Sequence, residues 1–304
     1  MHTHPRRASR RAKRGSRAAR VAVAAVGAAL LLTATVRPAL LHGANSGDEL
    51  TGREIIEKVN QRSFGRSVSQ RLTLRITDPK ARVRERGLLG FRSFTPTASR
   101  LAFYVTSPPD MRNMAYLVHD RLEPGKDDDQ WIYTPARATP RRLAAMNLRE
   151  SFLGSEFTLD DVKKFFRIEI DHYDWKRTAT HEEDGRTIHE VEQTPRTEAL
   201  AKALGVSRMR NFVDGEHWVR LRVEQHDLEG RPLRSIRIAV VDDEHEGPQL
   251  VKAAAKNVQT GAVSKIAFHD RSYERPIEEG VFTLRGLQRE EVVRLERGFA
   301  HPRE

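Results

Sequence analysis

The segment SFLGSEF, residues 151–157, places a serine beside a glycine and an acid, as a catalytic nucleophile turn does. A hydrolase nucleophile elbow has the pattern G-x-S-x-G and follows a buried strand of a parallel sheet. Leu153 and Phe157 stand where the two glycines of that pattern would be around Ser155. The segment is therefore predicted to be a turn beside a helix cap. In this interpretation Phe152, Leu153 and Phe157 supply apolar surface on either side of the bend.

The other residue types that support chemistry lack the required spacing. The twelve histidines contain no H-E-x-x-H pattern, and residues 127–129, three aspartates, lack the spaced ligands of a calcium loop. The chain has no cysteine and no glycine-rich phosphate loop, which excludes disulfides, thiol chemistry and a cysteine zinc site. We therefore predict no catalytic residue, no metal and no cofactor, and a protein that is not an enzyme. A hydrolase that uses Ser155 or the nearby acids is the least favoured alternative.

Two adjacent arginines, Arg141 and Arg142, follow a proline and precede an apolar residue. On an edge strand, consecutive side chains point to opposite faces, so one of the pair could contact an anionic headgroup near an apolar concavity. A solvated surface pair is the alternative, since charged side chains are mostly exposed.

The net charge of +11 belongs almost entirely to the first part of the chain. Residues 1–44 contain nine Lys and Arg and no Asp or Glu, which leaves 44 basic against 42 acidic residues in the rest. A basic stripe of the kind that binds nucleic acid is therefore not indicated.

Residues 1–44 also have the pattern of an export signal. A basic region ends at Arg20, the apolar run VAVAAVGAALLLTATV follows, and small residues come at positions 43 and 44. The run is shorter than the ~20 residues that a membrane-spanning helix needs. The sequence predicts a cleaved signal peptide and a mature protein in the periplasm.

Two capping patterns and one amphipathic stretch predict helices. Thr51 and Glu54 form a capping box before residues 52–62, and Leu50 can pack on Ile55 as a staple. Thr158 and Asp161 resemble a second capping box, and the stretch TEALAKAL, residues 197–204, is amphipathic.

Most of the remaining chain alternates with a period of two, which predicts short strands. Turn signals such as Asp-Gly and Glu-Gly recur between them, and no linker divides residues 45–304, so we predict one mainly β domain with an antiparallel meander. Roughly ten strands would curl into a barrel or half-barrel, whose interior must be filled by side chains, a helix or a ligand. The predicted strands lie at residues 72–76, 88–94, 101–105, 114–118, 131–133, 173–180, 188–191, 218–223, 233–241, 251–258 and 263–269.

The middle of the chain resembles the LolA-like family of outer-membrane lipoprotein-sorting proteins. That family has a proline-acidic turn, a W-x-Y-x-P-A strand, a basic strand and an S-F-x-G-S-D-F segment followed by an acidic pair. The helix TGREIIEKV and the F-T-x-R-x-L close near residues 282–287 add weaker resemblance at both ends, whereas residues 197–211 have no counterpart. The matching residues are Pro109, Asp110, Trp131, Tyr133, Pro135, Ala136, Arg141, Arg142, Ser151, Phe152, Gly154, Ser155, Phe157, Asp160 and Asp161.

The resemblance implies a strongly curved antiparallel sheet, an unclosed half-barrel, with a few helices covering its open side. It also implies a carrier that holds lipoprotein acyl chains or other envelope lipids in an apolar cavity, beside an RND-type inner-membrane transporter. An acyl chain contributes about 0.8 kcal/mol for each buried CH₂, so no catalytic group is needed. An envelope sensor or interaction module on the same fold is the alternative. The predicted cavity or lid residues are Leu101, Phe103, Trp131, Tyr133, Phe152, Leu153 and Phe157, with Arg141 and Arg142 at the headgroup.

Overall fold

The computed structural model describes eight stretches of the chain, all within one compact unit, Gly47–Glu304. The predicted export signal, residues 1–44, lies outside them. No helix in these stretches is long and apolar enough to cross a membrane. The described stretches are residues 49–62, 67–95, 98–121, 128–143, 148–243, 247–273, 275–288 and 291–300.

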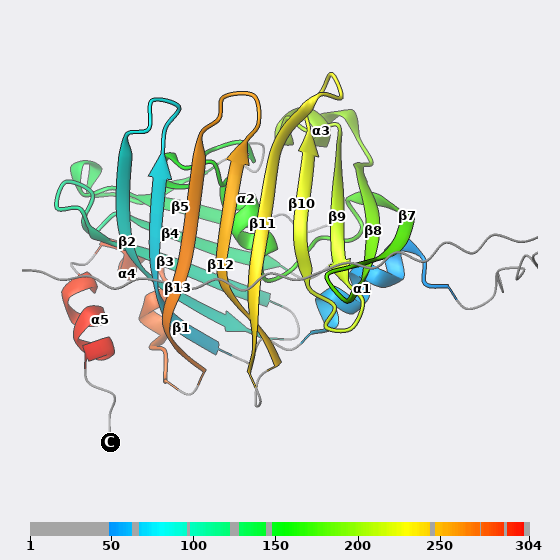
Figure 1. The fold of residues 1–304 in the computed structure, drawn as a ribbon. Coiled ribbons are helices and arrows are strands. Elements are labelled where there is room, and N and C mark those ends of the chain that lie inside the picture. Colours follow the sequence, from blue (N-terminus) through cyan, green and yellow to red (C-terminus); the bar gives the residue numbers. More distant parts are fainter. Residues whose placement is uncertain are drawn as a thin grey trace, which may run out of the picture. The chain divides into compact units, whose positions relative to one another are not determined.

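Thirteen strands form one antiparallel sheet, which confirms the mainly β, antiparallel prediction (Figure 1). Short helices accompany it: α1 (Gly52–Gln61), η1 (Pro135–Arg137), η2 (Phe152–Gly154), α2 (Leu159–Lys164), α3 (Glu198–Leu204), η3 (Glu279–Phe282), α4 (Leu284–Gln288) and α5 (Glu291–Ala300). The strands are β1 (Ser67–Thr77), β2 (Val83–Phe94), β3 (Ala98–Ser107), β4 (Ala115–Arg121), β5 (Asp129–Tyr133), β6 (Arg141–Arg142), β7 (Tyr173–Glu183), β8 (Arg186–Pro195), β9 (Arg208–Asp214), β10 (Arg220–His226), β11 (Pro232–Asp243), β12 (Gly247–Asn257) and β13 (Val263–Ser272).

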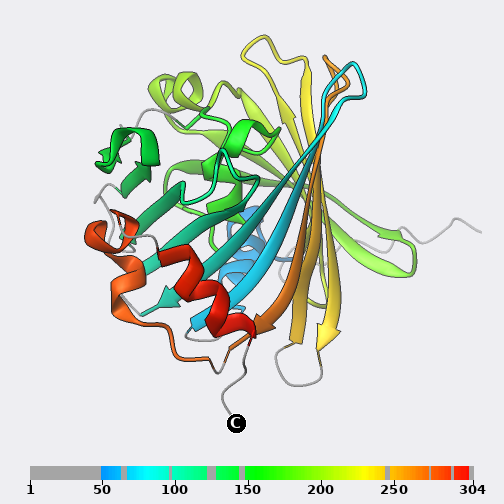
Figure 2. The ribbon, with the colours of Figure 1, turned by 90° about the vertical axis from the view of Figure 1, so that its left-hand side faces the viewer.

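The strand order explains why the sheet is open and why a segment crosses it. The order is β6-β5-β4-β3-β2-β1-β13-β12-β11-β10-β9-β8-β7, so β1 pairs with β13, and β6 and β7 form the two ends. These two strands are consecutive in the chain but lie at opposite edges. The described part of the connection between them, residues 148–172, therefore passes across the curved sheet and packs against it. Figure 2 shows the curvature and α2 in green within it.

The first helix begins as its sequence predicts. Thr51 Oγ1 accepts from the backbone N of Glu54 at 3.2 Å, and the Glu54 carboxylate accepts from Thr51 N at 2.7 Å. Gly52 allows the helix to lie directly on β7, because a Cβ there would lie 2.7 Å from the backbone N of Arg177. Ile55, with Leu50 beside it, packs into a cluster with residues of β8 and β9.

A second layer covers the other face of β2–β5, where no helix was predicted. η3, α4 and α5 supply Phe282, Leu287 and Val292 to a cluster that includes Leu89 and Tyr104 of the strands (Figure 2). The Tyr104 hydroxyl donates to the backbone O of Val281 at 2.7 Å. The F-T-x-R-x-L segment thus forms helical turns after the last strand, and part of β2–β5 is covered on both faces.

Candidate functional site

The concave face of the sheet carries a continuous apolar wall. Alternate residues of each strand point to this face, and on β1 these are Leu72, Leu74 and Ile76, all at most 4% exposed. The same alternation on the neighbouring strands extends the wall. Further strand residues of this cluster are Leu88, Leu101, Phe103, Val105, Tyr116, Val118, Met209, Val223, Ile236, Leu250, Ala253, Ala255 and Ile266.

Residues 151–167, here called the plug segment, fill the space in front of this wall. The Phe152 ring contacts Phe103 and Tyr116, each at 5.4 Å between ring centroids. Phe157 is fully buried and packs edge-on against Phe165 at 5.8 Å. The plug segment also contributes Leu153, Leu159 and Val162 to the same cluster.

The SFLGSEF turn depends on two residues in the left-handed region and one hydroxyl. Leu153 has φ 55° and Gly154 has φ 73°, so the chain reverses within two residues. A left-handed leucine is uncommon and costs on the order of 1 kcal/mol, which burial of its side chain offsets. Ser155 Oγ donates to the backbone O of Phe152 at 2.6 Å and accepts from the backbone N of Phe157 at 3.1 Å.

Replacing Ser155 by Ala is expected to lower the free energy of unfolding by about 1–3 kcal/mol, because the buried N–H of Phe157 loses its acceptor. Urea unfolding measures the change. The matched control is Ser151→Ala, because Ser151 is exposed and its loss is expected to change stability by less than about 0.5 kcal/mol. Loss of an ester-hydrolysing activity in Ser155→Ala, with stability unchanged, would contradict this structural role.

Helix α2 brings four ionised side chains into the concave interior. Its capping box forms as predicted, with Thr158 N donating to Asp161 Oδ2 at 2.8 Å. Lys164 Nζ lies 2.6 Å from Asp160 Oδ2 and donates to the Tyr173 hydroxyl at 2.7 Å. Burial and the ammonium of Lys164 act on the pKa of Asp160 in opposite directions, and burial dominates, so the pKa rises.

Three polar side chains of the sheet anchor α2 to the wall. Arg234 of β11 pairs with Asp161 at 2.9 Å and also donates to the backbone O of Glu156. Gln225 of β10 donates to Asp161 Oδ1 at 3.1 Å. Arg220 donates to the backbone O of Lys164 at the end of the helix, where the helix dipole favours a cation.

Lys163 lies among three carboxylates that come from separate parts of the chain. It pairs with Asp128 and with Glu169, and the carboxylate oxygens of Asp120, Asp128 and Glu169 lie within 4.8 Å of one another. Burial raises the pKa of Asp120 to about 7, whereas Lys163 holds the pKa of Glu169 at about 2 against its own burial. No local spacing in the sequence marks this cluster. Three carboxylates could ligate a cation, but the Lys163 ammonium already serves as their counter-charge.

The structure separates the seven predicted lipid contacts into two groups. Leu101, Phe103, Phe152, Leu153 and Phe157 meet in the concave cluster, each at most 5% exposed.

The other two predicted contacts, Trp131 and Tyr133, lie on the opposite face of β5, under the C-terminal helices. Ile132, between them, is the β5 residue that packs on the concave cluster. Trp131 and Tyr133 lie on one face because residues i and i+2 of a strand share a face. Lipid contact by the seven residues, in the cavity or in a lid, stays a prediction.

The predicted headgroup residues lie at the edge of the sheet. Arg141 and Arg142 make up β6, and both are exposed. Arg142 pairs with the carboxylate of Asp129 on the neighbouring strand β5. Neither arginine belongs to the concave cluster among the described residues, and headgroup contact stays a prediction.

Comparison with known proteins gives the same architecture. A family model described as "uncharacterized protein" matches residues 98–289, which is more than half of the chain. No curated relative matches the sequence. The outer membrane lipoprotein-sorting protein domain from Vibrio parahaemolyticus superimposes with a TM-score of 0.70 at 22% identity, over 78% of this chain and 98% of that one. The chain belongs to the family that this model describes, and the superposition shows that it has the fold of the lipoprotein-sorting domain.

Two further solved structures share this fold. A DUF1329 family protein from Desulfovibrio piger has a TM-score of 0.69 at 19% identity and covers 78% of this chain and 97% of its own. A LolA superfamily protein from Nitrosomonas europaea has a TM-score of 0.59 at 18% identity, over 77% and 98% of the two chains. At these identities the likeness concerns the fold, an unclosed antiparallel sheet with few helices.

Proposed function

We propose that this LolA-like protein is an envelope lipid carrier that holds acyl chains of lipoproteins or other lipids against its concave wall. The observation that carries the proposal is the continuous apolar wall, which the plug segment covers together with Leu204 and Val206 at the end of α3. A second sheet or a thick helical layer over this wall would bury it permanently. The plug segment is only 17 residues long and most of its helix is polar, so it can detach from the wall.

Lipid binding on this face requires the plug segment to move. A cavity of about 20 Å³ lies beside the plug, lined by residues such as Phe165 and Ile238, and it holds little more than one water molecule. An acyl chain of about 14 methylenes gains roughly 11 kcal/mol on burial at about 0.8 kcal/mol each. Six buried plug side chains at roughly 2 kcal/mol each gain about the same. The plug segment and an acyl chain therefore gain similar free energy from burial on the same surface and can compete for it.

The ion pairs and hydrogen bonds that hold α2 to the sheet are compatible with a segment that detaches. Buried ion pairs such as Arg234–Asp161 add little net stability relative to apolar packing, but they hold one geometry. When the plug leaves, its charged groups return to water and regain their hydration. The proposed location is the periplasm, with the export signal at residues 1–44 and an RND-type inner-membrane transporter as the partner, as the LolA-like resemblance suggests.

The direct test recovers the protein from its native envelope and extracts its lipids for mass spectrometry. We expect an acyl lipid to copurify and a fluorescent fatty acyl probe to bind the delipidated protein. Recovery of no lipid together with no uptake of the probe would overturn the carrier proposal.

A reversible lock tests whether the plug must move. Glu156 N donates to Ser264 Oγ of β13 at 2.9 Å, so these two positions are neighbours, and a pair of cysteines placed there is the candidate disulfide in a chain with no cysteine of its own. The oxidised double variant is expected to take up the acyl probe at least tenfold more slowly, and reduction is expected to restore uptake. The single variants Glu156→Cys and Ser264→Cys are the controls. Equal uptake by the oxidised and reduced forms would contradict a moving plug.

A further inference from the structure

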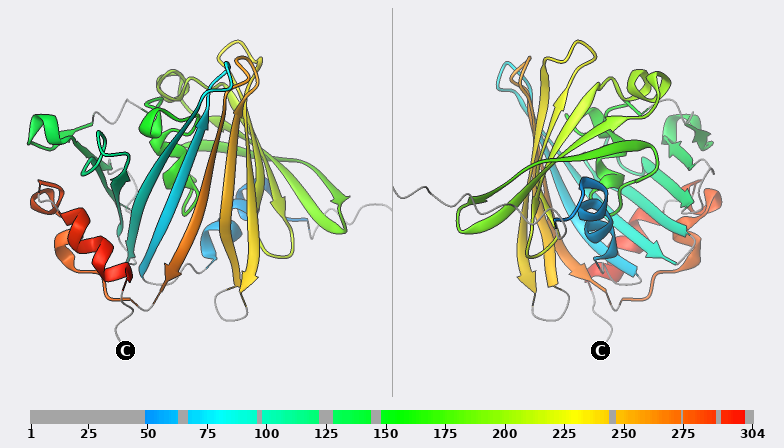
Figure 3. Two further views of the ribbon diagram at one scale, coloured as in Figure 1. Left: turned by 60° about the vertical axis from the view of Figure 1, so that its left-hand side comes forward. Right: turned by 90° about the vertical axis from the view of Figure 1, so that its right-hand side faces the viewer.

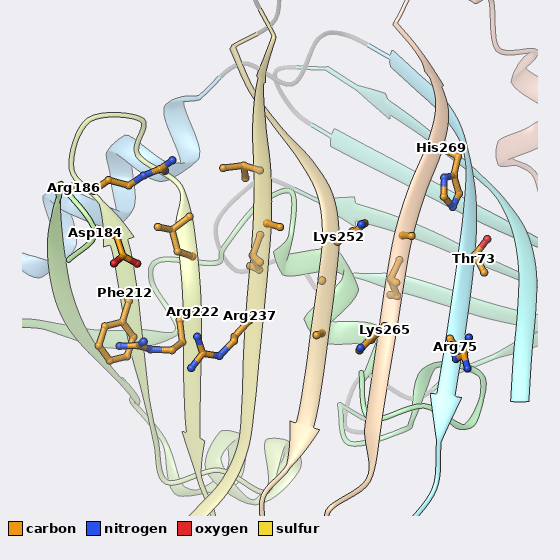
Figure 4. A pocket seen from close by; sticks show the side chains of 18 of the residues that line it. Thr73, Arg75, Asp184, Arg186, Phe212, Arg222, Arg237, Lys252, Lys265 and His269 are labelled. Carbon is orange, nitrogen blue, oxygen red and sulfur yellow. The ribbon is translucent and has the colours of Figure 1, made fainter. Parts of the chain in front are cut away.

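The face of the sheet opposite the plug segment carries a groove that the carrier proposal does not use. Thr73 and Arg75 of β1 alternate with the concave residues Leu72 and Leu74, so they point to this outer face. A cavity of about 1120 Å³, here called the outer groove, spreads over the outer face from β8 to β1 (Figure 4).

The floor of the outer groove contains a straight row of cations. Strand register places Arg222 of β10 opposite Arg237 of β11, and Arg237 opposite Ala254 of β12. Ala254 lies opposite Lys265 of β13, which lies opposite Arg75 of β1. The row thus crosses five neighbouring strands, with a cation on four of them and an alanine on β12, and Figure 4 shows its charged side chains along the groove.

Two neighbouring pairs in this row have the same charge. Arg222 faces Arg237, and Lys265 faces Arg75, and like charges directly opposite each other destabilise a sheet. Arg222 is partly compensated by Glu183 and by stacking on Phe212 at 3.7 Å. Within the described part of the chain, no carboxylate pairs with Arg237, Lys252 or Lys265, whose side chains are exposed. An anionic ligand that bound between these side chains would reduce the repulsion between them.

The shape of the outer groove favours a narrow ligand over a flat surface. The β7–β8 hairpin projects beyond the sheet (Figure 3), and its tip residues Glu183 and Asp184 line one wall. Glu85 of β2 stands at the other end of the row, opposite Arg75. An anionic bilayer would meet the projecting hairpin and these carboxylates before it reached the cations. An extended peptide can enter between the walls.

We propose that the outer groove binds an acidic, extended peptide segment of a partner protein. The row spans four strand spacings, or about 19 Å at ~4.8 Å each, which an extended chain covers in about six residues. The alanines Ala239, Ala254 and Ala267 keep the floor low between the cations, so a peptide backbone can approach the sheet. The site lies on the face opposite the lipid wall and does not depend on lipid carriage.

The test measures the binding of a labelled eight-residue peptide of alternating Glu and Ala to the protein by fluorescence anisotropy. A labelled peptide of alternating Lys and Ala is the control for the sign of the charge. The full mature protein is expected to bind the acidic peptide alone, and binding is expected to weaken steeply as salt rises from 0.05 to about 0.5 M because the charges are exposed. The double variant Arg237→Glu with Lys265→Glu is expected to bind at least tenfold more weakly. The control, Arg137→Glu with Lys202→Glu, changes the net charge equally at two exposed positions outside the groove and is expected to bind as the wild type does.

A stability measurement separates loss of the site from loss of the fold. The groove variant replaces two like-charged pairs by opposite ones, so its melting temperature is expected to equal or exceed that of the wild type. Equal loss of peptide binding in the groove and control variants would overturn the proposal. So would binding to anionic phospholipid vesicles, dependent on Arg237 and Lys265, by a protein that does not bind the acidic peptide.

Discussion

Replacing Lys164 by Met is expected to lower the free energy of unfolding by about 3–5 kcal/mol, which is the usual cost of removing one partner of a buried ion pair. Lys164 and Asp160 are both at most 7% exposed, and the ammonium also donates to Tyr173. Without it, Asp160 is left as a buried carboxylate whose pKa rises further, so folding must take up a proton. Urea unfolding at pH 7 measures the loss.

The chain contains a matched control for this variant. Lys202 and Glu198 form the same i,i+4 pair on α3 at 2.5 Å, but both side chains are more than 60% exposed. Lys202→Met is expected to cost less than about 0.5 kcal/mol. The double variant Lys164→Met with Asp160→Leu is expected to recover most of the lost stability, because an apolar pair of similar volume replaces the ions. Equal effects of Lys164→Met and Lys202→Met would contradict the burial argument.

The stability of the folded protein is expected to fall as the pH rises from about 4 to about 7, through the titration of Asp120. Burial raises the pKa of Asp120 to about 7, from about 3.9 in an unfolded chain. Between these values the folded protein binds a proton that the unfolded chain does not, so raising the pH favours unfolding. Each unit of pKa shift corresponds to about 1.4 kcal/mol, and we expect a loss of about 1–3 kcal/mol between pH 5 and pH 8.

Asp120→Asn isolates this contribution. Asparagine retains a hydrogen-bond donor toward Asp128 but does not titrate. The fall in the free energy of unfolding between pH 5 and pH 8 is therefore expected to be smaller in this variant by the contribution of Asp120. The control is Asp171→Asn, because Arg53 holds the pKa of Asp171 below its usual value and the group stays ionised throughout this range. Glu169, whose pKa is lowered to about 2, acts at lower pH and stabilises the protein as pH rises from about 2 to about 4.5. An unchanged pH dependence in Asp120→Asn would contradict the assignment.

Local rules predicted the helix starts well. Thr51 and Thr158 form the expected capping boxes, because a capping box is decided within four residues. Two elements were missed although their spacing is visible. In β9, Arg208 and Arg210 alternate with Met209, and in α5 the apolar positions 292, 295 and 299 recur at helical spacing.

The assignment of side chains to faces could not be read from the sequence. The run LAFYV in β3 is apolar at every position, which indicates burial on both faces but does not say which residue points where. Phe103 points to the concave wall and Tyr104 to the C-terminal helices. The face on which Trp131 and Tyr133 lie is hidden for the same reason, since the layer that covers them comes from a segment about 150 residues further along the chain.

The carboxylates around Lys163 were missed for a different reason. Asp120, Asp128 and Glu169 are far apart in the chain and meet only because the segment after β6 returns across the sheet. Each alone has the pattern of a turn or surface acid, so no local spacing marks the cluster.

The two ends of the open sheet expose the protein to self-association. A strand at the end of a sheet leaves backbone N–H and C=O groups unpaired, and these can recruit a strand of another molecule and start aggregation. One end, β6, has only two residues, and both are exposed arginines. The other end, β7, has eleven residues, carries Asp174, Lys176 and Glu182 among its side chains, and lies against α1. A short charged edge and a charged edge strand that lies against α1 both disfavour pairing with a strand of another molecule.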